Sequence, residues 1–136
     1  MTLPRECEVF IDGASRGNPG PSGIGAVFIE GGKTIRQVSK YLGHTTNNVA
    51  EYLALAYALQ EALQAGFTTL TVKSDSELLV RQVNGQYKVR DPQLRLFHGL
   101  VGHLMQGFAM CRVEHIPRSQ NRLADRAAAQ AVDRVS

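Results

Sequence analysis

The sequence predicts an α/β fold, in which a five-stranded mixed sheet with the strand order 3-2-1-4-5 is flanked by helices. Two observations carry this prediction. Three short β-forming segments follow one another through tight connections, a pattern typical of an antiparallel meander. Two later strands each come after a helical segment, and such crossovers place them parallel to the first strand. The chain has the length of one domain, and we expect residues 1–136 to form it.

The expected elements are short and separated by turn-forming residues. Glycine-rich turns separate the first three strands, as in successive hairpins. The first helix is rich in Ala and Leu, with Asn47 or Asn48 as its cap and Gly66 at its end. Asp91-Pro92 starts the third helix, and Asn121 caps the last one. We expect strands at residues 7–12, 24–30, 34–42, 69–73 and 110–116, and helices at residues 49–65, 76–83, 91–106 and 122–135.

Composition and charge narrow the classes of function. The net charge of +3, from 15 basic and 12 acidic residues, favours polyanions mildly and excludes a tail that binds nucleic acid by charge alone. No apolar run approaches the ~20 residues that span a membrane, and no signal-peptide pattern opens the sequence. We expect a cytoplasmic protein without a membrane partner, and a monomer. Cys7 and Cys111 lack metal-site spacing and are expected to be reduced thiols rather than a disulfide or a zinc site.

Four carboxylates lie where the predicted fold can bring them together. Asp12 ends the first strand, Asp75 follows the fourth, and Glu51 and Asp125 lie in the first turns of two helices. Three of them have an ordinary interpretation alone: a turn-former for Asp12, an N-cap for Asp75, and an acid favoured by the helix dipole for Glu51. Because sites form beyond the carboxyl ends of parallel strands, the ends that carry Asp12 and Asp75 are candidates for such a site.

Carboxylates that converge need their charge neutralised. Four like charges in one place repel one another unless protons or metal ions neutralise them. All-oxygen ligands suit Mg²⁺ or Mn²⁺, and two such ions roughly 4 Å apart can activate a water and stabilise the leaving oxygen of a phosphodiester. The sequence shows no Ser-His-Asp arrangement, activated cysteine or Walker-type phosphate loop that would compete for this chemistry.

Four motifs carry a resemblance to a known family. The segments DGASRGNPGPSGIGAVF, TTNNVAEYLALAYAL, SDSELLV and NRLADRAA occur in the order and spacing of the type 1 ribonuclease H family, over about residues 9–132. The resemblance implies a ribonuclease H-like fold and endonucleolytic hydrolysis of the RNA strand of RNA–DNA hybrids, which leaves 5′-phosphate and 3′-hydroxyl ends. It implies two Mg²⁺ ions, with Mn²⁺ as a substitute. The catalytic, metal-binding carboxylates of the family match Asp12, Glu51, Asp75 and Asp125.

The same resemblance implies roles for these and other residues. Asp12 is expected between the two ions, Glu51 and Asp75 at the ion near the leaving group, and Asp125 at the ion near the nucleophile. The residues expected to bind the substrate are Gly13, Ala14, Ser15, Asn18, Thr46, Asn47, Asn48, Ser76 and Glu77. The backbone of Gly13, Ala14 and Ser15 matches family contacts with ribose 2′-hydroxyls, and so do Ser76 and Glu51. Asn18 and Thr46 match contacts with a DNA-strand phosphate, and Asn47 and Asn48 match contacts in the minor groove. Turn or cap formation is the alternative for each Asn, and we favour capping for Asn48.

Three departures from the family pattern matter. Glu77 stands where the family often has Gln, and an ionised carboxylate only accepts hydrogen bonds. Many members have a loop His that aids product release, whereas here a short loop carries Arg118, which could contact the scissile phosphate; His115 is expected to be structural. The basic, tryptophan-containing handle of some members is missing, so Lys88 and Arg90 either touch the DNA backbone or belong to a solvated loop. The compact form resembles variants that lack the handle, some of which also cut double-stranded RNA.

Two other classes of function compete with a hybrid nuclease. The first is a binding module that recognises A-form duplexes without cutting them, and the presence of all four carboxylates argues against it. The second is another enzyme on the same fold, such as a DNA-junction resolvase or an integrase core. The TTNN and GNPG motifs argue against this second class, because they match the parts of the family that contact the hybrid.

Overall fold

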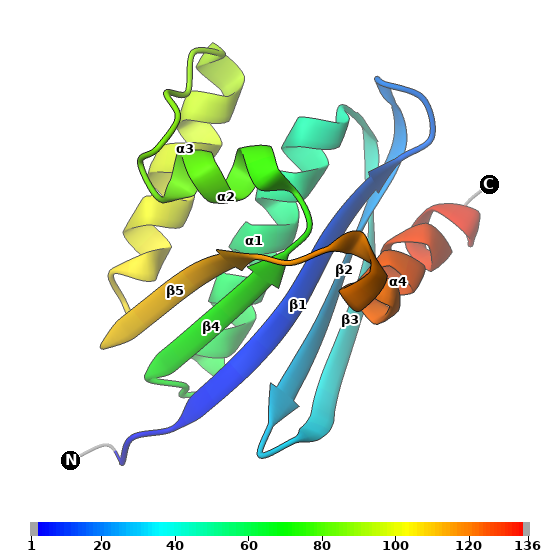
Figure 1. The fold of residues 1–136 in the computed structure, drawn as a ribbon. Coiled ribbons are helices and arrows are strands. Elements are labelled where there is room, and N and C mark those ends of the chain that lie inside the picture. Colours follow the sequence, from blue (N-terminus) through cyan, green and yellow to red (C-terminus); the bar gives the residue numbers. More distant parts are fainter. Residues whose placement is uncertain (1–2, 135–136) are drawn as a thin grey trace.

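A computed structural model describes residues 3–134 and shows one five-stranded sheet packed against helices (Figure 1). The strands are β1 (Glu6–Ser15), β2 (Gly20–Glu30), β3 (Lys33–Thr45), β4 (Thr69–Ser74) and β5 (Met110–His115). The helices are α1 (Asn47–Gln64), α2 (Glu77–Val83), α3 (Pro92–Met105) and α4 (Arg122–Asp133), with a short 3-10 helix, η1 (Arg118–Gln120), before α4. The predicted succession of strands and helices is confirmed.

Strand pairing confirms the predicted strand order and directions. β2 pairs antiparallel with β1 and with β3, and β4 pairs parallel with β1 and with β5, which gives the order β3-β2-β1-β4-β5. The register places Ile11 of β1 opposite Ser74, the last residue of β4. Because Asp12 and Asp75 are the next residues along these two strands, the pairing brings both to the same edge of the sheet.

The two faces of the sheet are covered by different helices. Successive strand residues point to opposite faces, so Ile24 and Gly25 of β2 face different helices. On one face α1 packs against β1 and β2 and in turn contacts α3, with Tyr52, Leu55 and Leu59 of α1 almost fully buried. On the other face α4 packs mainly on β2 through alanine side chains. Residues 3–134 contain no helix that combines the length and the apolar character needed to cross a membrane.

The start of α1 differs from the prediction. The helix begins at Asn47, and its N-cap is Thr46, whose hydroxyl accepts a hydrogen bond from the backbone N–H of Val49 at 3.3 Å. The predicted capping by Asn47 or Asn48 is therefore wrong. Thr46 has the extended backbone that a cap requires, whereas both asparagines already belong to the first helical turn. The side chain of Asn18 accepts from the free N–H of Asn47 at 3.1 Å and joins the β1–β2 turn to the helix.

Other boundaries shift by a few residues for non-local reasons. β1 continues to Ser15 because it pairs with β2 as far as the Ser15–Ser22 pair. The loop expected after β5 contains the 3-10 helix η1. The described part of α4 ends at Asp133, and residue 135, the predicted end of that helix, lies outside the described residues.

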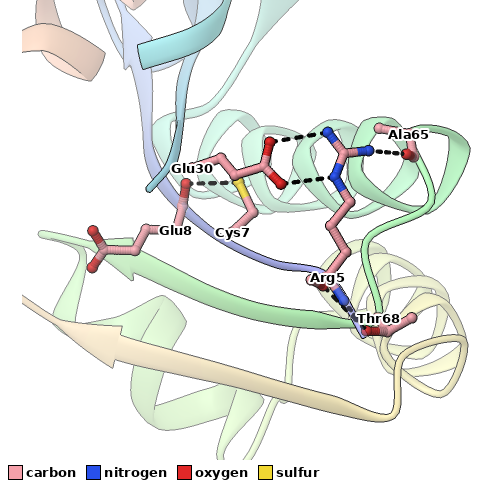
Figure 2. A network of polar contacts seen from close by, with 6 residues as sticks. All are labelled: Arg5, Cys7, Glu8, Glu30, Ala65 and Thr68. Atoms are coloured by element: carbon pink, nitrogen blue, oxygen red, sulfur yellow. Dashed lines mark hydrogen bonds and ion pairs between the residues drawn. The ribbon is translucent and has the colours of Figure 1, made fainter. Parts of the chain in front are cut away.

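Arg5 lies just before β1, at the opposite end of that strand from Asp12, and links the end of β2 to the segment between α1 and β4 (Figure 2). Its guanidinium donates to both carboxylate oxygens of Glu30, at 2.7 and 3.0 Å, and to the carbonyl oxygen of Ala65 at 2.8 Å. The same group lies 4.2 Å from the centroid of the Phe67 ring. Cys7, next along β1, is a buried free thiol whose pKa is raised to about 11, mainly by burial.

Candidate active site

One cavity lies where the carboxyl ends of the central strands β1 and β4 meet. It brings together side chains from distant parts of the sequence. Its volume is about 310 Å³, and all four predicted carboxylates line it. Asp12 comes from β1, Asp75 from the residue after β4, Glu51 from α1 and Asp125 from the first turn of α4. The complete lining is Asp12, Gly13, Ala14, Ser15, Asn47, Glu51, Asp75, Arg118 and Asp125.

Asp12 lies at the centre of the carboxylate group. Only 6% of its surface is exposed. Its pKa is raised to about 10, first by burial and then by the charges of Glu51 and Asp75, and hydrogen bonds with Asp125 and Glu51 raise it further. All three other carboxylates therefore act on Asp12 directly. At neutral pH it keeps its proton unless another positive charge takes the place of that proton.

Glu51 is held by the backbone of β1 directly after Asp12. Its Oε1 accepts a hydrogen bond from the N–H of Gly13 at 2.8 Å, while its buried Oε2 finds no hydrogen-bond donor within residues 3–134. Burial raises the pKa of Glu51 to about 7, against the opposing effect of the Gly13 N–H. The close approach requires glycine, since a Cβ at position 13 would lie 2.5 Å from the carbonyl carbon of Ala50.

Asp75 is oriented by Asn121, which the sequence analysis assigned only as a cap. Asn121 occupies the N-cap position of α4 as predicted, and its carbonyl oxygen accepts from the N–H of Asp125 at 3.0 Å. Its side chain, which is 1% exposed, makes no capping bond within residues 3–134. Its Nδ2 instead donates to Asp75 Oδ2 at 3.1 Å and to the carbonyl oxygen of Ile11 at 2.8 Å. The amide thus joins the residue before Asp12 to Asp75. Its place at a helix start, where Asn is common for local reasons, gave no sign of this longer-range role.

Asp125 reaches the cavity because α4 lies unusually close to β2. A Cβ at Gly25, the pairing partner of Asp12, would lie 2.2 Å from the carbonyl oxygen of Ala124. Asp125 is less buried than Asp12 and Glu51, with 44% of its side chain exposed. Arg118 of η1 forms a loose ion pair with it, with 3.9 Å between Nη2 and Oδ1, and is itself 82% exposed. Arg118, the only cation among the described residues that line the cavity, can therefore turn toward solvent or a bound anion.

Comparison with known proteins identifies the family. The family profile described as Reverse transcriptase-like matches residues 10–131. Ribonuclease HI of Halobacterium salinarum is 39% identical over 125 residues, which cover 91% of this chain and 63% of that protein. The crystal structure of RNase H1 from this archaeon has a TM-score of 0.93 at 38% identity, and the match covers 95% of this chain and 98% of that chain. The chain belongs to the type 1 ribonuclease H family.

Two further family members resemble this ribonuclease H chain. LC11-RNase H1, isolated from compost by a metagenomic approach, was solved in complex with an RNA/DNA hybrid; it has a TM-score of 0.90 at 39% identity, with 95% of this chain and 98% of that chain covered. A bifunctional protein of Mycobacterium tuberculosis is 40% identical over 124 residues, which cover 90% of this chain and 34% of that protein. The chain therefore spans less than two thirds of the length of the Halobacterium and Mycobacterium relatives it matches in sequence.

The substrate-binding residues predicted from the ribonuclease H resemblance fall into two sets. Gly13, Ala14, Ser15 and Asn47 line the carboxylate cavity. The others lie outside its lining and have structural partners within residues 3–134 or are exposed. Ser76 caps α2 through Leu79 N–H, and Glu77 is exposed and paired with Arg81 at 2.9 Å. Thr46 and Asn18 take part in the start of α1, and Asn48 is exposed in its first turn.

The donor set of the cavity fits a hard divalent cation. Within residues 3–134, no group of three or more His, Cys, Asp or Glu side chains is arranged so that it could hold a metal ion. The four carboxylates nevertheless offer only oxygen atoms, and Glu51 Oε2 is a buried acceptor without a donor. The raised pKa values of Asp12 and Glu51 show that the site favours added positive charge. Oxygen ligands of this kind suit Mg²⁺ or Mn²⁺ rather than a soft metal.

Proposed function

We propose that this chain is a divalent-metal-dependent endoribonuclease that hydrolyses the RNA strand of RNA–DNA hybrids and leaves 5′-phosphate and 3′-hydroxyl ends. The observation that carries the proposal is the convergence of four carboxylates on one cavity. Asp12 lies close enough to the other three that each of them raises its pKa. Family membership supports the reaction class. The hybrid bound to LC11-RNase H1 supports the substrate.

Asp12, Glu51, Asp75 and Asp125 would hold two Mg²⁺ ions, or Mn²⁺ in their place. Bound there, the ions would supply an activated water and stabilise the charge on the leaving oxygen. The protein keeps the ligands in place: Gly13 N–H fixes one oxygen of Glu51, and Asn121 fixes one oxygen of Asp75. Asp12, whose raised pKa retains a proton at neutral pH, would have to release that proton in order to act as a ligand.

Recognition of the RNA strand is assigned to the last residues of β1, directly after Asp12. The backbone of Gly13, Ala14 and Ser15 lines the cavity and would contact ribose 2′-hydroxyls, the groups that distinguish RNA from DNA. Asn47 lines the same cavity at the start of α1 and would contact the minor groove of the duplex. Since A-form geometry and 2′-hydroxyls are shared by double-stranded RNA, we propose a weaker side activity on that substrate.

Arg118 is assigned a contact with the scissile phosphate. It lines the cavity, is 82% exposed and has only a 3.9 Å ion pair with Asp125 to break. An Arg118→Ala variant should lower kcat about tenfold or more without changing the Tm, because this exposed side chain adds little to stability but would stabilise transition-state charge. An unchanged kcat would remove Arg118 from the mechanism.

The test of the proposed function compares three end-labelled duplexes of one sequence: the hybrid, double-stranded RNA and double-stranded DNA. Each is incubated with Mg²⁺, with Mn²⁺ or with EDTA, and an Asp75→Asn variant is run beside the wild type. We expect metal-dependent cleavage of the RNA strand, fastest in the hybrid, and a loss of at least a hundredfold in the variant. Equal cleavage by the variant, or hybrid binding without any cleavage, would contradict the proposal, and the second result would favour a duplex-binding module.

A further inference from the structure

The connection between α2 and α3 carries unpaired positive charge. Lys88 and Arg90 in the connection, and Arg95 at the start of α3, are exposed, and none of them forms an ion pair within the described residues. The acids of α2 and of the α3 cap have other partners: Glu77 pairs with Arg81, and Asp91 caps α3 by accepting from the N–H groups of Gln93 and Leu94. The connection therefore presents a net positive surface, which suits the phosphates of a duplex.

This stretch has no regular secondary structure, and Val89 within it packs against the hydrophobic core. We define the basic segment as residues 86–90, which lie between the end of α2 and the cap of α3. Its start is tied to α2, because the N–H groups of Gln86 and Tyr87 donate to the carbonyl oxygen of Arg81 at 2.8 and 3.2 Å. Its later part, which carries the charges, has one hydrogen bond within residues 3–134: Gln82 Nε2 donates to the carbonyl oxygen of Lys88 at 3.4 Å.

Gln82 is in turn held by the helix that carries Glu51. Its Oε1 accepts from the hydroxyl of Tyr52 at 2.6 Å, and its backbone carbonyl lies 3.1 Å from His98 Nε2. The carbonyl oxygen of Lys88 can only accept, so the amide must turn its nitrogen to Lys88 and its oxygen to Tyr52. Gln82 is 6% exposed and Tyr52 is 1% exposed, which makes this link a buried one.

We propose that Tyr52 and Gln82 are positioning residues that hold the basic segment in register with the carboxylate cavity, so that Lys88 and Arg90 contact the phosphate backbone of the bound duplex. The inference rests on the proposed function, because the duplex is the substrate of that cavity. Tyr52 directly follows Glu51 in α1. One turn of this helix therefore positions a carboxylate of the cavity and, through Gln82, the side chains of Lys88 and Arg90. Figure 1 shows α2 and its connection to α3 beyond the carboxyl end of β4. Asp75 is the residue that directly follows this strand.

The perturbation is Tyr52→Phe, which removes the hydroxyl and leaves Gln82 Oε1 buried without its donor. The amide can then rotate and release the carbonyl of Lys88. The matched control is Tyr57→Phe on the same helix, whose ring lies near Lys40 rather than near the basic segment. A second variant, Lys88→Ala with Arg90→Ala, removes the charges themselves and should lower the salt slope of binding by roughly 0.9 per lost phosphate contact.

The experiment measures the Kd for a labelled hybrid by fluorescence anisotropy at several salt concentrations, with Ca²⁺ in place of Mg²⁺ and the RNA checked for integrity. Steady-state cleavage with Mg²⁺ is measured in parallel, well below the Tm of each variant. We expect Tyr52→Phe to raise Kd and KM about three- to tenfold with kcat unchanged, and Tyr57→Phe to change neither. Added to the Lys88→Ala, Arg90→Ala variant, Tyr52→Phe should change Kd by less than twofold, because the charges that it positions are already gone.

Three results would overturn the inference. The first is an unchanged Kd in Tyr52→Phe. The second is that Tyr52→Phe raises the Kd of the Lys88→Ala, Arg90→Ala variant as much as it raises that of the wild type. The third is a lower kcat at an unchanged KM in Tyr52→Phe, which would mean that Tyr52 acts through Glu51. A wild-type protein that binds the hybrid but does not cleave it would contradict the proposed function alone, and the Kd comparison would still decide the role of Tyr52 and Gln82. A wild-type protein that does not bind the hybrid would overturn both.

Discussion

Replacing Asn121 by aspartate would exchange one buried amide for a carboxyl of the same shape. In the wild type, the Nδ2 of Asn121 donates to Ile11 O at 2.8 Å and to Asp75 Oδ2 at 3.1 Å. An ionised carboxyl at this position can donate to neither and places a like charge beside Asp75. The variant Asn121→Asp therefore breaks the link that orients Asp75 while leaving the volume of the side chain almost unchanged.

The magnitude follows from the two hydrogen bonds and the burial. Leaving a buried carbonyl without its donor costs about 1–3 kcal/mol, and a hydrogen bond to a charged group is worth about 1.5–3 kcal/mol. We therefore expect a loss of about 3–5 kcal/mol in the free energy of unfolding at pH 8. For a chain of this size, about 3.5 °C of Tm corresponds to 1 kcal/mol, so the Tm should fall by roughly 10–17 °C.

The pH dependence gives the variant a distinctive signature. Burial beside Asp75 raises the pKa of the new carboxyl above its unfolded value. Its neutral form can still donate one hydrogen bond, so the loss is smallest below the unfolded pKa and grows as the pH rises through the folded pKa. Thermal unfolding between pH 5 and 8 measures this, with Asn84→Asp, an exposed amide that donates to Val113 O, as the control. An Asn121→Asp variant within 2 °C of the wild-type Tm at every pH, with full activity, would refute the reasoning.

Three further predictions concern the support of the site. Gly25→Ala places a Cβ 2.2 Å from Ala124 O and pushes α4 away, so kcat should fall at least tenfold together with the Tm; an undiminished kcat would contradict the role of this close packing in placing Asp125. Arg5→Lys loses the paired hydrogen bonds to Glu30 and should lower the Tm in a melting experiment. Because Arg5 lies at the opposite end of β1 from Asp12, kcat should not change, and a lower kcat at an unchanged Tm would contradict this prediction. Burial raises the pKa of Asp12 to about 10 from 3.8, so its contribution to stability is present below pH 3.8 and is lost as the pH rises toward 10. The Tm increase on adding Mg²⁺ should accordingly be larger at pH 8 than at pH 6, and an increase independent of pH would count against cation binding at Asp12.

Much of the fold was predictable because its signals are local. Glycine-rich turns mark the meander, and Asp91-Pro92 marks the start of α3, where the Asp91 carboxylate accepts from Gln93 and Leu94 as a cap should. The crossover rule then determined the parallel pairing of β4 and β5. The exact helix start was harder, since Thr46, Asn47 and Asn48 are all good caps and only the backbone of the folded chain selects Thr46.

The site was predictable to the extent that its residues lie in local motifs. The four carboxylates lie in four such motifs, and the strand register places two of them side by side. The residues that orient them were not predictable, because their partners are far away in sequence. Asn121 is 46 residues from Asp75, and Tyr52 is 30 residues from Gln82. The closeness of α4 to Gly25 likewise depends on packing between elements that no single motif contains.

The most direct test of the central claim is the rate of RNA-strand cleavage in a hybrid as Mg²⁺ is titrated, for the wild type and for Asp12→Asn. Asp12 lies beside all three other carboxylates, so the loss of its charge should affect every cation held in the cavity. We predict a saturable, Mg²⁺-dependent rate for the wild type, products with 5′-phosphate ends, and a rate at least about a thousandfold lower for the variant. Cleavage that persists in EDTA, or an Asp12→Asn rate equal to that of the wild type, would contradict the assignment of this carboxylate group as the catalytic centre.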